Sequence, residues 1–230
     1  MNRTKIEYLD YTTNPIVGCS GIGCSVRKNC WAMKQAKRKK HVCELCYSFV
    51  PHVHWERFDD FLTIKKPARI GVSFMGEFFD RQIANWVRKD YYMHLLKAPQ
   101  HFFIIFTKQP QNIDEEPLPD NVGIGVSVNC KKDLWRINVL RDANVKCRIV
   151  SFEPLYEDLS DCNLKDIDWV IIGGQTRPKL LPKYDWISSL RTNAYMSGCA
   201  VFLKNNLIPI LGTDKPQQEF PKLWYDAFPE

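Results

Sequence analysis

The stretch Arg148–Pro154, which reads RIVSFEP, decides the fold because it is a short apolar run that stops abruptly at a charged residue. Runs of similar length, rich in β-branched and aromatic residues, recur at Ile70–Phe74, Phe102–Phe106, Val122–Val128, Trp169–Ile172 and Ala200–Leu203. Apolar residues occupy neighbouring positions in these runs, so we expect both faces of each strand to be buried. Strands buried on both faces are typical of parallel sheets.

Segments with helical periodicity lie between several of these runs. They cover about Asp80–Lys97 and Lys132–Arg141, and a third begins at a helix N-cap at Asp185 and ends at Gly198. A further apolar run at Pro15–Gly18 adds a first strand. The alternation of strands and helices predicts an α/β fold, a partial β/α barrel of about six to seven parallel strands.

The domain organisation follows from where this alternation is interrupted. We expect one domain over residues 1–230, with a Cys/His-rich insertion at residues 31–66 and an irregular C-terminal tail at residues 207–230. Phe220 and Trp224 are the expected anchors of that tail.

Polar residues and glycines follow the strands at the points where the strands end. The carboxyl ends of parallel barrel strands share one face, and that face carries the chemistry of barrel enzymes. The residues found at these strand ends are Cys19, Gly76, Glu77, Thr107, Lys108, Ser127, Asn129, Glu153, Pro154, Gly173, Gly174, Gln175, Lys204, Asn205 and Asn206. No catalytic residue is assigned from the sequence.

Cysteines are concentrated near the N-terminus. Cys19, Cys24, Cys30, Cys43 and Cys46 place five of the nine cysteines within 28 residues. In a reducing compartment such clusters are typical of metal sites rather than disulfides. Thiolates at this density indicate a soft metal ion or an iron–sulfur cluster.

Three readings of these cysteines stay open: an iron–sulfur cluster, a zinc site, or five unligated thiols. Three thiolates at Cys19, Cys24 and Cys30 suit a [4Fe–4S] cluster that keeps one iron open. The second reading is zinc, because Cys43, Cys46, His52 and His54 form a Cys-x2-Cys-x5-His-x-His array with His41 close by. Both metals can be present together, and Cys43 and Cys46 are also alternative cluster ligands. The remaining cysteines are expected to be small core residues: Cys130, Cys147, Cys162 and Cys199.

Composition and charge restrict the class of protein. The 230 residues carry a net charge of +6 and 45% hydrophobic residues, which is typical of a globular protein. No apolar run reaches the roughly 20 residues of a membrane-spanning helix, and no signal-peptide core follows the N-terminus. We therefore expect a cytoplasmic location and no membrane partner. The basic excess is either a solvated helix face or a surface for a polyanion, and it is concentrated at Lys34, Lys37, Arg38, Lys39 and Lys40.

Several short motifs together resemble the phage Gp37/Gp68 family, a three-Cys-motif, DUF5131-type group that is similar to radical S-adenosylmethionine (SAM) enzymes. The resemblance covers most of the chain in order. The motifs that carry it are Asn14–Cys19, Cys30–Ala32, Pro51–Phe58, Ser73–Phe79, Thr107–Pro110, Gly125–Asn129, Ser151–Leu155 and Asp168–Gly174. The family usually has a cysteine three positions before Cys30, where this chain has Arg27. Either Cys24 supplies the middle ligand or Cys43 and Cys46 substitute for it.

The resemblance implies a radical SAM-type enzyme with a [4Fe–4S] cluster and SAM as cofactors. Gly76 and Glu77 would bind the methionine amino group, and Gly173 and Gly174 would lie against the adenosyl part. Ser127, Asn129 and Glu153 would contact ribose or carboxylate. A ferredoxin or flavodoxin would supply the electron, and a macromolecule, with nucleic acid the leading class, would be the substrate. The alternative from another class is a zinc-stabilised nucleic-acid-binding module without catalysis.

Overall fold

The computed structural model describes residues 1–38 and 43–227. Lys39, Lys40 and His41, which belong to the predicted basic stretch and its neighbouring histidine, lie outside the described residues. Residue contacts group the chain into two compact units. Unit 1 comprises residues 1–123 and 144–146, and unit 2 comprises residues 124–143 and 147–230. The prediction of a single domain stays a prediction.

Unit 1 contains two separate sheets. Its larger sheet has the strand order β1-β2-β5-β6, in which β2, β5 and β6 run parallel and β1 is antiparallel to β2. The smaller sheet is an antiparallel pair of β3 and β4. The strand bounds are Asn2–Arg3 (β1), Tyr11–Thr13 (β2), Ile16–Val17 (β3), His52–Val53 (β4), Ala68–Val72 (β5) and His101–Thr107 (β6).

The predicted first strand at Pro15–Gly18 is wrong as a member of the parallel sheet. The strand that pairs with β5 is β2, whereas Ile16 and Val17 pair with β4 in the smaller sheet. Both of these residues are buried, so their apolar character reflects burial in a different sheet. The β2 residues are only partly apolar and half-buried, and they therefore lack the continuous apolar run by which the other strands were recognised.

The helices of unit 1 pack their apolar residues against aromatic rings. Tyr91 of α3 contacts the rings of Phe58, Phe61 and Phe78 at centroid distances of 4.9 Å, 6.4 Å and 5.9 Å. The α-helices are Trp31–Ala36 (α1), Glu44–Ser48 (α2) and Asn85–Leu95 (α3). The 3₁₀ helices are Arg27–Asn29 (η1), Trp55–Arg57 (η2), Asp60–Thr63 (η3) and Pro110–Asn112 (η4).

The start of α3 differs from the predicted start near Asp80. Asp80 is fully buried, and its carboxylate accepts hydrogen bonds from the backbone N–H groups of Ser20 and Gln82 at 2.7 Å and 3.1 Å. These bonds hold residues 80–84 in turns, so the helix begins at Asn85. The local apolar periodicity does not reveal a long-range bond of this kind.

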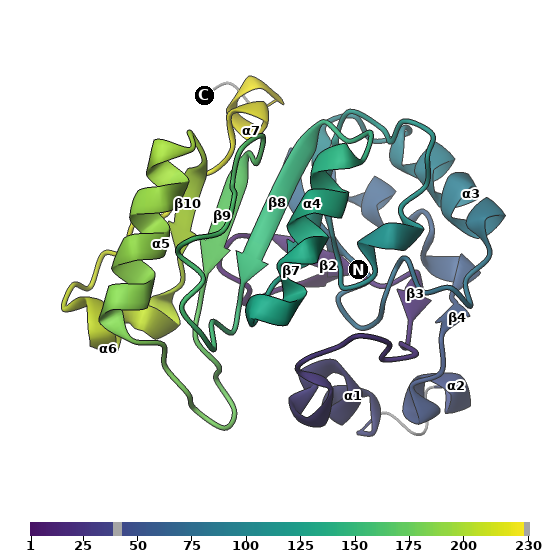
Figure 1. Cartoon of the computed structure of the whole chain (residues 1–230). Helices are drawn as coiled ribbons and strands as arrows, with labels where there is room; N and C mark the ends of the chain where they lie inside the picture. Colours follow the sequence, from purple (N-terminus) through teal and green to yellow (C-terminus); the bar gives the residue numbers. More distant parts are fainter. Residues whose placement is uncertain (39–42, 228–230) are drawn as a thin grey trace. The chain divides into compact units, whose positions relative to one another are not determined.

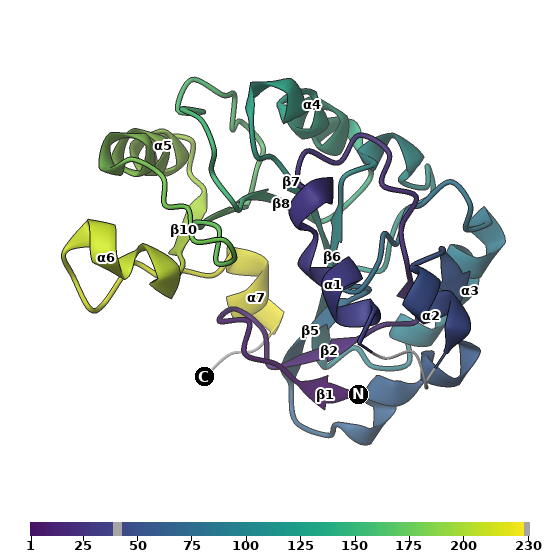
Figure 2. The ribbon, with the colours of Figure 1, turned by 90° about the horizontal axis from the view of Figure 1, so that it is seen from below.

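Unit 2 contains the strand order β7-β8-β9-β10. Trp169 of β9 is in register with Ile149 of β8 and Ala200 of β10. In unit 2, α4 and α5 lie on one side of these strands and α7 on the other (Figures 1 and 2). The strands are Val122–Ser127 (β7, its first two residues in unit 1), Cys147–Phe152 (β8), Trp169–Ile172 (β9) and Ala200–Leu203 (β10). The helices are Lys131–Asp133 (η5), Trp135–Asp142 (α4), Tyr184–Met196 (α5), Asn205–Leu207 (η6), Ile208–Leu211 (α6) and Lys222–Ala227 (α7).

Two expectations for unit 2 need correction. The N-cap of α5 is Lys183, and Asp185 lies in the first turn of the helix instead. Gly198, with φ of 77°, follows the end of the helix as predicted. The tail is less irregular than predicted because it contains α6 and α7. Phe220 is confirmed as an anchor, because its ring lies 5.5 Å from that of Trp169 in β9. The ring of Trp224 lies 6.2 Å from that of Phe220, within the tail itself.

The predicted α/β class with about six to seven parallel strands is confirmed, since seven strands are parallel. Among the described residues, no helix combines the length and the apolar character that crossing a membrane requires.

Candidate metal centre

Cys43, Cys46, His52 and His54 come together in unit 1 through a short helix and a short strand. Cys43 is the N-cap of α2, where its Sγ accepts a hydrogen bond of 3.4 Å from the backbone N–H of Cys46. The chain turns back at Phe49, which has a left-handed φ of 59°. It then enters β4, beside α2 in Figure 1. Alternate residues of an extended chain share one face, so His52 and His54 both face the two cysteines.

The ligand atoms of these four residues all lie within 4.8 Å of one another. Cys46 Sγ lies 3.4 Å from His52 Nε2 and 3.1 Å from His54 Nε2. Cys43 Sγ lies 3.6 Å from His52 Nε2, and the two Nε2 atoms are 2.9 Å apart. Tetrahedral zinc with ordinary bond lengths places its ligand atoms about 3.3–3.8 Å from one another. The observed spacing is close to that of a single tetrahedral ion.

Hydrogen bonds outside the centre set which ring nitrogens face it. His52 Nδ1 lies 2.8 Å from the carbonyl oxygen of Val50, and His54 Nδ1 lies 2.7 Å from Glu56 Oε1. Both oxygens accept, so each neutral imidazole carries its hydrogen on Nδ1 and presents the Nε2 lone pair inward. Partners of this kind orient metal-binding histidines in known metal sites. Two lone pairs 2.9 Å apart repel each other unless a cation lies between them.

The local electrostatics favour the protonation states that bind metal. The backbone N–H of Cys46 is the main cause that lowers the pKa of the Cys43 thiol. Burial is the main cause that lowers the pKa of His54, and it outweighs the opposing hydrogen bond to Glu56. A thiolate and a neutral imidazole are the forms that ligate a metal ion. Two sulfurs and two nitrogens at these distances form a closed donor set suited to zinc.

Cys19, Cys24 and Cys30 are placed differently. In the part of the chain that the structure describes, the four residues above are the one convergent group of Cys, His, Asp or Glu side chains, and these three cysteines are outside it. Cys19 and Cys30 pack with Met33 and Met75 on a small core. That core comprises Ala32, Ala36 and Phe49.

Backbone N–H groups two or three residues further along the chain also hold the thiols of Cys19 and Cys30. Cys19 Sγ accepts from the N–H of Gly21 at 3.2 Å, and Cys30 Sγ caps α1 by accepting from the N–H of Met33 at 3.4 Å. Burial is the main cause that raises the pKa of Cys19 to about 11. Cys24 is half-exposed and takes no part in this packing. Among the described residues, the structure therefore brings Cys19 and Cys30, but not Cys24, to one core.

The strand-end residues of unit 1 lie next to the Cys19 loop. Gly76 forms a parallel bridge with Gly18, and the N–H of Glu77 donates to the carbonyl of Gly18 at 3.0 Å. The Glu77 carboxylate is buried and accepts from Thr107 Oγ1 at 2.6 Å and from the N–H of Lys108 at 2.9 Å. Burial raises its pKa above the usual value. Glu77 thus joins the ends of β5 and β6.

The strand ends of unit 2 also converge. Glu153, after β8, forms an ion pair of 2.5 Å with Lys204, which follows β10. A Cβ on Gly173, after β9, would lie 3.0 Å from the Lys204 side chain and 3.1 Å from that of Glu153. Gly174 exchanges two backbone hydrogen bonds with the Asn206 amide, at 3.1 Å and 2.8 Å. Lys204 and Asn206 are among the strand-end residues expected from the sequence, although neither was assigned a cofactor role.

Ser127 and Asn129, at the end of β7, are held by hydrogen bonds to other residues of unit 2. The Ser127 carbonyl accepts from Arg136 at 2.6 Å, and the Asn129 side-chain amide donates to the Pro154 carbonyl at 2.9 Å. Both residues are buried.

Sequence reasoning also missed Glu56 as the partner of His54, although a carboxylate two residues after a candidate ligand is a usable signal.

Comparison with known protein families shows to which family the chain belongs. The family described as "Protein of unknown function (DUF5131)" matches residues 3–207. The chain belongs to the DUF5131 family. The predicted family is therefore confirmed, and this DUF5131 protein contains a Cys/His group able to hold a metal ion. No curated protein and no solved structure matches the chain.

Proposed function

We propose that this DUF5131 protein binds one zinc ion through Cys43, Cys46, His52 and His54, and that the ion has a structural role. The observation that carries the proposal is the convergence of four electron-pair donors while both histidine Nδ1 atoms are engaged elsewhere. All four tetrahedral positions are filled by protein ligands. Structural zinc sites are closed in this way, whereas catalytic sites keep one position for water or substrate.

The zinc ion would stabilise the loop that carries the other cysteines. The N–H of Cys19 donates to the carbonyl of Phe49 at 3.1 Å, directly after α2. A Cβ on Gly18 would lie 2.1 Å from the Val50 carbonyl oxygen, so the backbone at Gly18 approaches the backbone at Val50 too closely for any residue with a side chain. β3 leads into this loop and pairs with β4, which carries His52. An ion that joins α2 to β4 would therefore also fix the position of Phe49, whose carbonyl oxygen accepts the hydrogen bond from Cys19.

Metal analysis of the purified protein tests the zinc proposal. We expect stoichiometric zinc in the wild type and a loss of that zinc in Cys46→Ala, because Cys46 contributes a buried thiolate to the centre. Cys24→Ala is the matched control, since it removes a thiol of unit 1 outside the group of four. If Cys46→Ala keeps stoichiometric zinc, or if Cys24→Ala loses it, the assignment of ligands is wrong.

A second function, radical SAM-type catalysis, has its own support. Cys19 and Cys30 share one small core, and the Gly18–Gly76 bridge places their loop beside Gly76 and Glu77. These are the residues to which the family resemblance assigns the methionine amino group of SAM. Thiolates of a [4Fe–4S] cluster bind different irons, so their sulfurs lie further apart than the ligands of a single ion. When bound, such a cluster supplies the electron for reductive cleavage of SAM.

Under this proposal each part of the chain has a defined task. Cys19, Cys24 and Cys30 would hold the cluster, and Met33 and Met75 would shield it from water. A ferredoxin or flavodoxin in a reducing cytoplasm would supply the electron. Lys34, Lys37 and Arg38 are exposed while Ala32 and Ala36 of α1 are buried, so this surface is the proposed contact with a nucleic-acid substrate.

Anaerobic reconstitution with iron and sulfide distinguishes the two proposals. We expect Cys19→Ala to lose iron and 5′-deoxyadenosine formation while keeping zinc, and Cys46→Ala to lose zinc. If the wild type binds zinc but takes up no iron, the cluster proposal fails and the zinc proposal stands. If iron uptake is equal in the wild type and in Cys19→Ala, the cluster ligands are wrongly assigned.

A further inference from the structure

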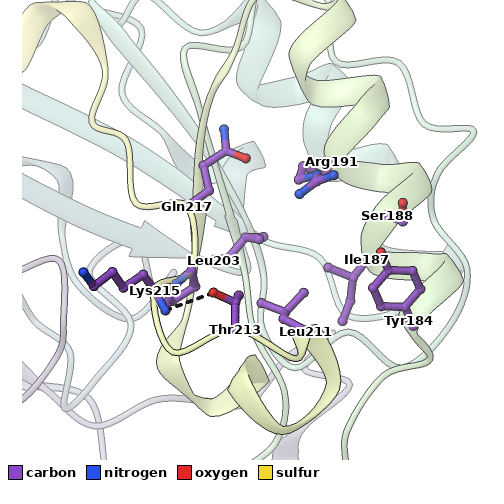
Figure 3. Close-up of a pocket in the computed structure, with 10 residues that line it drawn as sticks. Tyr184, Ile187, Ser188, Arg191, Leu203, Leu211, Thr213, Lys215 and Gln217 are labelled. Carbon is purple, nitrogen blue, oxygen red and sulfur yellow. Dashed lines mark hydrogen bonds between the residues drawn. The ribbon is translucent and has the colours of Figure 1, made fainter.

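Unit 2 contains a cavity that none of the functions above uses. It has a volume of about 370 Å³ and lies between α5, the end of β10 and the segment that follows α6. Figure 3 shows the residues of α5 on one side and Leu211, Thr213 and Gln217 on the other. A volume in this range accommodates a small organic molecule.

The floor of the cavity is apolar. It consists of Ile187 from α5, Leu203 from β10 and Leu211 from α6. Ile187 and Leu203 are 1% exposed, so they are fixed by the packing of unit 2. Tyr184 and Ser188 of α5 border this floor with hydroxyl groups. The cavity therefore favours a ligand with an apolar body and a polar end.

Arg191 determines the charge that the polar end must carry. It lines the cavity, and no ion pair joins it to an acidic group among the described residues. Its helical neighbours at spacings of three and four residues are Ile187, Ser188, Ala194 and Tyr195, none of which is acidic. Lys215, the other cation of the lining, extends away from the cavity in Figure 3. A guanidinium without a carboxylate partner, at a cavity with an apolar floor, is suited to bind a carboxylate in bidentate fashion.

The polar groups on the opposite side already have hydrogen-bond partners within the protein. Gln217 Nε2 donates to Glu219 Oε1 at 2.8 Å, and Thr213 Oγ1 accepts from the N–H of Lys215 at 3.2 Å. The backbone carbonyl of Gln217 accepts from the N–H of Leu203 at 2.7 Å. These bonds hold the segment after α6 in place as a wall, and they leave Arg191 as the charged recognition group.

We propose that this cavity binds a small monocarboxylate with an apolar chain. The carboxylate pairs with the Arg191 guanidinium, and the chain lies over Ile187, Leu203 and Leu211. The site shares no residue with the metal centre, because its lining belongs to unit 2 and the four metal-binding residues belong to unit 1.

Calorimetric titration of the full chain with octanoate tests this proposal. We expect saturable binding of octanoate and no saturable binding of 1-octanol, which has the same chain without the charge. Arg191→Gln should weaken octanoate binding by roughly tenfold or more, because it removes a charge-assisted pair. Leu211→Ala should weaken it to a smaller extent through the loss of apolar contact. Arg177→Gln, at an exposed position outside the cavity, should leave the affinity unchanged.

Arg191 is itself exposed, so its replacement should leave the fold intact. The absence of saturable octanoate binding to the wild type would overturn the proposal. Equal octanoate affinity in the wild type and Arg191→Gln, or a loss of affinity in Arg177→Gln as large as that in Arg191→Gln, would overturn it as well.

Discussion

Replacement of Glu56 tests whether Cys43, Cys46, His52 and His54 are organised as a metal site. Glu56 Oε1 lies 2.7 Å from His54 Nδ1 and thereby directs Nε2 toward Cys46. Loss of such a partner typically lowers metal affinity by about 10–100-fold. The Glu56 side chain is 67% exposed, so water can replace part of its interaction. We therefore expect Glu56→Ala to lower zinc affinity by about tenfold, which corresponds to about 1.4 kcal/mol.

The Gln variant separates the charge from the hydrogen bond. Glu56→Gln keeps an oxygen that can accept from His54 but removes the negative charge. Charge-assisted hydrogen bonds are roughly twice as strong as neutral ones, so Glu56→Gln should lose about half of the free energy, or about threefold in affinity.

Competition between the protein and a chromophoric zinc chelator at fixed pH measures these affinities. Glu44→Ala is the matched control, because Glu44 is an exposed carboxylate on α2. Equal zinc affinity in Glu56→Ala and the wild type would refute the assigned role of Glu56. A loss in Glu44→Ala as large as that in Glu56→Ala would show that only the general negative charge matters.

Three further predictions concern stability. Gly18→Ala should destabilise the protein more than Gly198→Ala in urea denaturation, because both have positive φ but only Gly18 has a backbone oxygen 2.1 Å from the new Cβ; equal losses would contradict this. Asp114→Ala should lower the free energy of unfolding by about 3–5 kcal/mol, because it leaves the buried Arg88 guanidinium without its carboxylate partner. Asp120→Ala changes a side chain that is 82% exposed and should be nearly neutral. Similar unfolding midpoints for the two variants would count against a stabilising role of the Arg88–Asp114 pair. Burial raises the pKa of Asp168 above 3.8, so the wild type gains stability relative to Asp168→Asn as the pH falls through that raised pKa toward 3.8 and loses it as the pH rises. A difference in unfolding free energy that does not vary with pH would disprove this effect.

Most of the sheet was predictable from local sequence. The runs that became β6, β8, β9 and β10 were located to within a residue or two, because strands buried on both faces need apolar side chains at consecutive positions. The strand that starts the parallel sheet was missed, because Tyr11–Thr13 is half-buried and partly polar. A strand at that position is recognised by its pairing with β5, which is a contact between residues far apart in the chain.

The spacing of Cys43, Cys46, His52 and His54 identified a candidate zinc site, but it did not rank that site above the cluster at Cys19, Cys24 and Cys30. The ranking depends on the distances between side chains. Those distances follow from the left-handed turn at Phe49 and from the pairing of β4 with β3. The cavity at Arg191 was not foreseen, since its lining comes from segments separated by up to 33 positions.

The amino-acid sequence alone determined the α/β class, the family and the identity of the residues able to bind metal, because burial and ligand chemistry are properties of residue types and their local spacing. Only the tertiary structure decided which thiols and imidazoles face one another, and which arginine lines a cavity with an apolar floor while making no ion pair within the described part of the chain. The physical reason is that a metal site or a ligand site requires side chains to meet within a few ångströms. Long-range backbone pairing and packing, rather than order along the chain, set those distances.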